Sequence, residues 1–167
     1  MVDVQIQTPL FNAIPAYKNG YQVTLADNGK MKINDKEYTR ITYDYTNNAK
    51  RVSPPKKGAY VTKDNAGKVV KEYAAKLGLN EKETSDLIAA SREKITADYA
   101  FISFFDQEMS EQILPIAFSP KPDNYLNVVF YFKNLDVLPN FTPAQPVFPE
   151  PVKRTGFTAV EVSEIVE

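Results

Sequence analysis

The feature that most constrains the fold is the apolar stretch from Tyr99 to Leu135, which reads YAFISFFDQEMSEQILPIAFSPKPDNYLNVVFYFKNL. Its first eight residues alternate between two faces that are both apolar, as in a strand at the interior of a sheet. A polar connector over 107–112 precedes a second strand over 113–119, whose proline marks an edge, a bulge or a break. A third strand follows over 125–135. The stretch therefore predicts three core strands that form a scaffold.

Two helices are predicted just before this stretch. Apolar residues at spacings of three and four indicate one helix from Asp64 to Leu77, which Gly78 would end. Asn80 then caps a second helix, and Glu83 three residues later completes a capping box. The short junction predicts a helical hairpin that covers one face of the sheet.

The N-terminal part predicts strands. Residues 2–6 alternate as a short strand, 7–20 read as a loop, and Tyr21–Tyr45 reads as a three-strand β-meander. Its turns are predicted at Asp27–Lys30, which contains Asn-Gly, and at Asn34–Lys36.

The C-terminal part contains five prolines between 136 and 151, which predict an extended, polyproline-like segment. Phe141, Val147 and Phe148 indicate that this segment packs along the body, and a last strand follows over 156–166. The sequence thus predicts one α+β domain over 1–167, with an antiparallel or mixed sheet of about seven strands and a helical hairpin on one face. Its predicted segments are an N-terminal strand and meander (1–46), the hairpin (62–95), the core strands (99–135), the proline segment (136–151) and the C-terminal strand (156–166).

The chain of 167 residues has neither Cys nor His, and its formal net charge is −1. Disulfides, thiolate nucleophiles, Cys/His zinc sites and Ser-His triads are therefore excluded within the chain. The near-zero charge gives no support to nucleic-acid binding. Calcium-loop and phosphate-loop motifs are absent as well, so we expect no metal and no cofactor.

Neither a signal peptide nor a membrane span is predicted. The N-terminal residues MVDVQIQTPLF have no basic region followed by an apolar core, and no apolar run approaches about 18 residues. We therefore expect no membrane insertion by this chain.

Carboxylates are the remaining candidates for catalysis. Asp106 and Glu108 follow one core strand and Asp123 precedes another, so adjacent strands could bring them together as the acid and base of a glycosidase. The alternative is that these acidic residues keep loops soluble and cap turns.

Lys121 and Asp123 lie in a connection that two prolines stiffen, Ser119–Asp123. One interpretation is a preorganised contact for a ligand or partner. The alternative is a rigid link in which Asp123 accepts hydrogen bonds from the backbone.

Tyr43 and Tyr45 lie two residues apart on one face of a predicted strand. If this face is exposed, the two rings suit a sugar or a protein partner. The alternative is that they extend the apolar face of Ile41 into the core. The connector over 46–58 carries Lys50, Arg51, Lys56 and Lys57, and it is either a solvated loop or a docking patch for an acidic partner.

Two motifs are especially distinctive, Leu77-Gly78-Leu79-Asn80 followed by Glu83, and Ser119-Pro120-Lys121-Pro122-Asp123. With them, nearly the whole chain resembles a family of uncharacterised, extracytoplasmic bacterial proteins. It departs from that pattern at Tyr60 and Val162, where the family carries Trp, and at Ser163-Glu164, where the family carries Gly-Gly. The resemblance implies one domain and an exported or membrane-tethered location through a leader outside this sequence, and it supplies no catalytic residue. The alternative is a cytoplasmic location.

These observations favour a non-catalytic binding or assembly module whose partner is a protein or a surface polymer. Its expected contact surface comprises the meander tyrosines, the basic connector and the proline segment. The alternative is a carboxylate-based hydrolase that acts on a sugar polymer.

Overall fold

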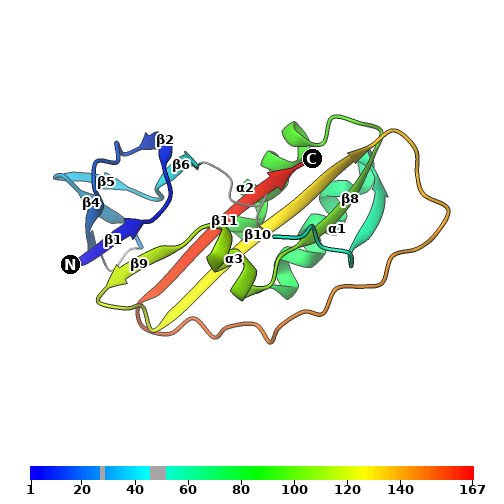
Figure 1. The fold of residues 1–167 in the computed structure, drawn as a ribbon. Coiled ribbons are helices and arrows are strands. Elements are labelled where there is room, and N and C mark those ends of the chain that lie inside the picture. The colour runs from blue at the N-terminus through cyan, green and yellow to red at the C-terminus, as the bar shows by residue number, and fades with distance from the viewer. Residues whose placement is uncertain (27–28, 46–51) are drawn as a thin grey trace.

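The computed structural model describes residues 1–26, 29–45 and 52–167. Within these residues the chain forms three helices and three sheets, an α+β architecture (Figure 1). The helices are α1 (Lys63–Lys76), α2 (Glu81–Lys94) and α3 (Gln107–Ile113). The strands are β1 (Val2–Ile6), β2 (Leu10–Ile14), β3 (Tyr21–Leu25), β4 (Met31–Ile33), β5 (Lys36–Tyr38), β6 (Thr42–Tyr45), β7 (Ala59–Thr62), β8 (Tyr99–Phe104), β9 (Ile116–Ser119), β10 (Asn124–Leu135) and β11 (Thr158–Val166).

The scaffold is a mixed sheet in the order β11-β10-β8-β7, here called the central sheet. Strand β10 pairs antiparallel with β8 and parallel with β11. In Figure 1, β10 and β11 lie side by side. Both faces of β8 and β10 are apolar, as the sequence predicts, because both faces are covered by other elements.

The helical hairpin covers one face of the central sheet. The face of Leu126, Val128 and Phe130 packs against buried residues of α1 and α2. The predicted capping box is present, since Asn80 Oδ1 accepts from the Glu83 N–H at 2.9 Å and the Glu83 carboxylate accepts from the Asn80 N–H. The residue after the first helix, Gly78, has a φ of 83°, which ends that helix as expected.

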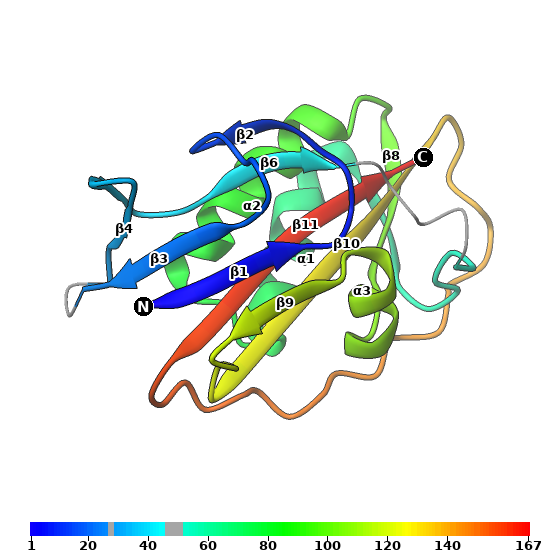
Figure 2. The same ribbon diagram turned by 60° about the vertical axis from the view of Figure 1, so that its left-hand side comes forward.

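The N-terminal strands cover the other face. Strands β5, β4, β3, β1 and β9 form one sheet in that order, and β2 pairs with β6. Side chains such as Tyr21, Val23 and Ile33 pack on Val129 and Tyr131 of β10. Figure 2 shows the resulting layers, with β1 and β6 in front of the central sheet and helices α1 and α2 behind it.

The prediction of one sheet of about seven strands is therefore wrong. Strands β3, β4 and β5 form a meander, but the chain then leaves it, and β6 pairs with β2 inside the predicted loop 7–20. Alternation in a sequence shows only that one face of a strand is buried, and it does not distinguish one wide sheet from stacked sheets. The predicted turn residues Asp27 and Asn28 lie outside the described residues.

The predicted polar connector over 107–112 is instead helix α3. Asp106 caps this helix by accepting from the Met109 N–H at 2.8 Å, and Ser110 and Ile113 three residues apart form its buried side. Of the residues that the pattern assigns to the core, four are only partly buried: Val69, Ile88, Ile116 and Phe118.

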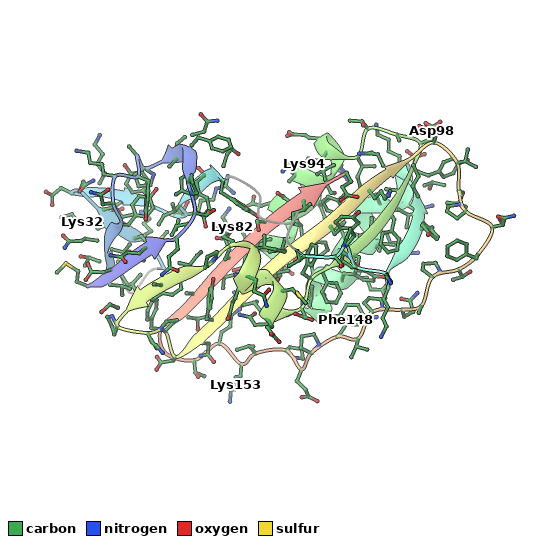
Figure 3. The ribbon with its side chains drawn as sticks, in the orientation of Figure 1. Lys32, Lys82, Lys94, Asp98, Phe148 and Lys153 are labelled. Carbon is green, nitrogen blue, oxygen red and sulfur yellow. The ribbon has the colours of Figure 1, made fainter. Side chains whose placement is uncertain are left out.

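The proline segment is extended and packs along the body, as predicted. Phe148 inserts between Tyr73 and Phe104, with ring centroids 5.2 Å from each, and Figure 3 shows it directed toward α1. Ala144 accepts a backbone hydrogen bond from Gly58, just before β7, at 2.9 Å. This segment therefore lies over the β7 edge of the central sheet.

Candidate functional site

The opposite edge of the central sheet, strand β11, lies along an elongated groove of about 1190 Å³. Residues of α2 form one wall, residues of β3, β4 and β6 with their connections form most of the other, and 156–164 form the floor. Lys82 and Lys94 mark the α2 wall in Figure 3. The groove is therefore built where the three layers of the fold meet.

The backbone of β11 presents hydrogen-bonding groups to this groove. Glu167 donates its N–H to the Phe132 carbonyl at 2.9 Å and accepts from the Asn134 N–H at 2.8 Å, so its backbone points toward β10. Since successive residues of a strand point to opposite sides, Val160, Val162 and Glu164 direct their N–H and C=O groups away from β10. Within the described part of the chain, no strand pairs with β11 on that side.

Two tyrosines of β6 reach side chains of β11 across the groove. The Tyr43 hydroxyl donates to Glu161 Oε2 at 2.7 Å, and the Tyr45 hydroxyl donates to Ser163 Oγ at 3.1 Å. The two rings stand edge to face with centroids 6.5 Å apart. Strands β6 and β11 are thus joined by side chains, with no backbone ladder between them in the described residues.

The carboxyl group of Glu161 is the most perturbed acid of the groove. Burial raises its pKa to about 7, an effect that the Tyr43 hydrogen bond partly opposes and the negative charge of Glu164 reinforces. Part of the residue is accessible from the groove, while the carboxyl end is desolvated. Burial also raises the pKa of Tyr45 to about 12 and that of Tyr43 further, so both hydroxyls stay protonated as donors.

Most other charged side chains that line the groove form ion pairs with one another. These pairs are Arg40 with Asp86, Lys82 with Asp86 (3.3 Å), Lys94 with Glu164 (3.0 Å), and Arg154 with Glu83 (2.7 Å). Glu161 differs from these acids, because its hydrogen-bond partner is a neutral hydroxyl and no described cation lies within ion-pair distance of it.

The predicted binding residues Tyr43 and Tyr45 are brought together at this groove. Their rings are half-buried and pack at the edge of the core cluster between the N-terminal strands and the central sheet. The pair therefore belongs partly to the core, as one interpretation expects, and is partly accessible, as the other expects. Their hydroxyls do not face solvent freely, since each is bonded to β11.

These contacts predict a stability cost for removing both rings. We expect Tyr43→Ala with Tyr45→Ala to lower the free energy of unfolding by about 2–4 kcal/mol, because half-buried aromatic surface and two hydrogen bonds are lost. Urea denaturation measures it. The matched control, Tyr43→Phe with Tyr45→Phe, keeps the rings and should lose about 1–2 kcal/mol. Equal losses for the two double variants would contradict this packing.

Lys121 and Asp123 do not line the groove, although Asp123 contacts its floor at Gly156 and Phe157. The Asp123 carboxylate accepts from the Phe157 N–H at 2.7 Å, and the Asp123 N–H donates to the Phe157 carbonyl at 2.8 Å. A side chain at Gly156 would collide with this carboxylate. Asp123 therefore joins the starts of β10 and β11 across the sheet, while Lys121 is exposed.

Asp106 and Glu108 are not brought near Asp123. Both are exposed in the first turn of α3, and neither lines the groove. Phe104 pairs with Phe130, so Asp106 lies about five strand positions, or roughly 17 Å, from Asp123. A glycosidase pair requires about 5–10 Å.

The sequence interpretation missed Glu161, although a signal for it exists. A carboxylate flanked by Val160 and Val162 in a strand that packs on both faces must be buried or line a cavity. For a metal, the described residues offer no convergent group of three or more Asp or Glu side chains. Searches of family models, curated proteins and solved structures find no match to the chain.

Proposed function

We propose that this protein is a non-catalytic binding module that takes an extended segment of a partner polypeptide into the groove as an additional strand on β11. One observation carries the proposal: the outward N–H and C=O groups of Val160, Val162 and Glu164 line the groove without a described backbone partner. An edge strand with free backbone groups binds an extended peptide through main-chain hydrogen bonds.

The dimensions and the opposite edge support this proposal. Strand β11 has 9 residues, which corresponds to about 30 Å of ladder. At the β7 edge the proline segment accepts a hydrogen bond from Gly58, the residue before that strand, whereas β11 has walls on both sides and no described strand on its edge. A regular pattern of backbone donors and acceptors fits a polypeptide better than a sugar polymer.

The other surfaces expected from the sequence support it less. Lys50 and Arg51 lie outside the described residues, and Lys56 and Lys57 are exposed and do not line the groove. The proline segment uses Phe148 for internal packing. Tyr43 and Tyr45 of β6, in contrast, lie in the groove wall.

The alternative of a carboxylate-based hydrolase has one supporting observation, the raised pKa of Glu161, which suits a general acid. Among the described residues that line the groove, no second carboxylate is left unpaired for catalysis. Glu83, Asp86 and Glu164 are each paired with a cation, and Asp44 accepts from the Asn12 amide at 2.8 Å. We therefore prefer the binding function.

Substitution of an outward donor tests the proposal. Decapeptides are selected from a random phage-displayed library with the natural protein, and their affinity is measured for Val162→Pro, which removes an N–H that serves only the added strand. We expect the affinity to fall by about 10- to 100-fold, since one main-chain hydrogen bond is lost and the peptide can no longer approach the strand as closely. Val160→Pro provides a second outward position, and Val162→Thr is the control that keeps the N–H. The proposal fails if no peptide is selected, or if both proline variants fold and bind as the natural protein does.

An exported location belongs to the same proposal, and the resemblance to extracytoplasmic proteins supports it. The described part of the chain contains no helix that is long and apolar enough to cross a membrane. Fractionation of cells that express the natural gene tests this location.

A further inference from the structure

We infer that the bound segment carries a lysine or arginine opposite Glu161, with apolar residues on either side of it. This inference rests on the proposed function, because it states what the groove would select in an added strand. It assigns Glu161 as a specificity-determining residue.

The pattern follows from the two faces of β11. Glu161 points to the face covered by the N-terminal strands, whereas Val160 and Val162 point to the helix side and pack against its core cluster. On that side, Leu87 and Ala90 form the apolar part of the α2 wall, between the ion-paired side chains of Lys82 and Lys94. A strand added beside β11 alternates in the same way, so one of its side chains stands next to Glu161 and the two flanking ones lie beside Val160 and Val162.

The charge next to Glu161 favours a cation. The groups facing its carboxyl are Tyr43 and Tyr45 from β6, Tyr125 from β10, and Glu164 from β11. None of these is positive, and the nearby Lys94 of α2 is bonded to Glu164 at 3.0 Å. An arriving ammonium or guanidinium group would therefore meet a carboxylate that has no described cation.

The surrounding rings add to this preference. Side chains directly opposite in adjacent strands have Cβ atoms about 5 Å apart, which is within reach of a lysine or arginine head group. The edge-to-face pair of Tyr43 and Tyr45 borders the same space, and aromatic faces attract cations. An acidic side chain there would face the carboxyl group of Glu161.

The same contact makes binding depend on pH. A basic side chain stabilises the ionised form of Glu161, so the pKa of this carboxyl falls on binding from about 7 toward its ordinary value of 4.5. Affinity for the peptide therefore increases as the pH rises. Below the pKa of Glu161 in the free protein, its carboxyl must first release a proton before it can pair with the basic side chain. Between about pH 5.5 and pH 8 the expected gain is roughly 30-fold.

The test is a parallel selection. The random decapeptide library is selected once with the natural protein and once with Glu161→Gln, which keeps the size and hydrogen bonding of the side chain. We expect Lys or Arg at one fixed position between two apolar residues in the first set only. A selected peptide should bind Glu161→Gln at least about 30-fold more weakly at pH 8, with no gain between pH 5.5 and 8. A synthetic version with glutamine in place of the basic residue should behave in the same way toward the natural protein.

The outcomes separate this inference from the function on which it rests. Peptides that bind the natural protein and are weakened by Val162→Pro, but show no basic preference and the same pH profile for both proteins, overturn the inference and leave strand addition intact. Failure to select any peptide overturns both. If Glu161→Gln does not fold, the glutamine version of the peptide and the pH profile of the natural protein decide the question.

Discussion

Replacing Phe130 with Ala is expected to lower the free energy of unfolding by about 3–5 kcal/mol. Phe130 lies at the centre of β10 and is fully buried, with ring centroids 6.4 Å from Phe104 and 6.0 Å from Phe132. Its truncation leaves a cavity between the central sheet and the helical hairpin, and the rigid ladders on both sides of β10 limit collapse around it.

Urea denaturation at neutral pH measures this loss. Val147→Ala is the control, because Val147 is 77 % exposed in the proline segment and its truncation should change stability by less than about 0.5 kcal/mol. A loss near zero for Phe130→Ala would contradict the placement of β10 at the middle of the fold.

The second large effect is a pH-dependent stability that arises from Glu161. Its pKa rises from 4.5 to about 7 on folding, so the folded state binds the proton more tightly than the unfolded state. The resulting stabilisation is fully present below about pH 4.5 and is lost as the pH rises through 7. A shift of this size corresponds to about 3 kcal/mol.

A comparison with Glu161→Gln isolates this contribution from those of the other acids. From pH 4 to pH 8, the natural protein should lose about 3 kcal/mol of free energy of unfolding relative to the variant. Tyr43→Phe should raise the pKa of Glu161 further, since the hydrogen bond from Tyr43 lowers it. A constant difference would show that the Glu161 carboxyl is hydrated in the folded state.

Much of the scaffold is predictable from the sequence because its signals are local. The capping box at Asn80 and Glu83, the glycine after the first helix and the two-sided apolar strands each specify one element without reference to the rest of the chain. The proline segment is predictable for the same reason, since proline removes the backbone donor that helices and ladders need.

The arrangement of the N-terminal strands is not predictable in this way. Strand β6 continues the alternation of the meander, yet it pairs with β2, and this choice depends on long-range packing over β10 and β11. The sequence pattern does not indicate helix α3, because only Ser110 and Ile113 are buried among its seven residues and the rest of the helix is polar.

The candidate site was predictable in part. The tyrosine pair was identified from its spacing, but its partners Glu161 and Ser163 lie 118 residues further along the chain. Edge status is likewise a property of the assembled sheet, so no local pattern in β11 indicates that its outer backbone groups lack a partner. Of the predicted carboxylates, Asp106 caps α3 and Asp123 joins the starts of β10 and β11, each by accepting a backbone hydrogen bond. Glu108 is exposed in the first turn of α3.

Amide hydrogen exchange along β11, with and without a selected decapeptide, tests the central claim most directly. Glu161, Ser163 and Ile165 donate toward β10 and should be protected in both states. Val160, Val162 and Glu164 should exchange rapidly in the free protein and become at least about 100-fold slower when the peptide is bound. Protection of these three amides in the free protein, or unchanged rapid exchange in the complex, would contradict strand addition at this edge.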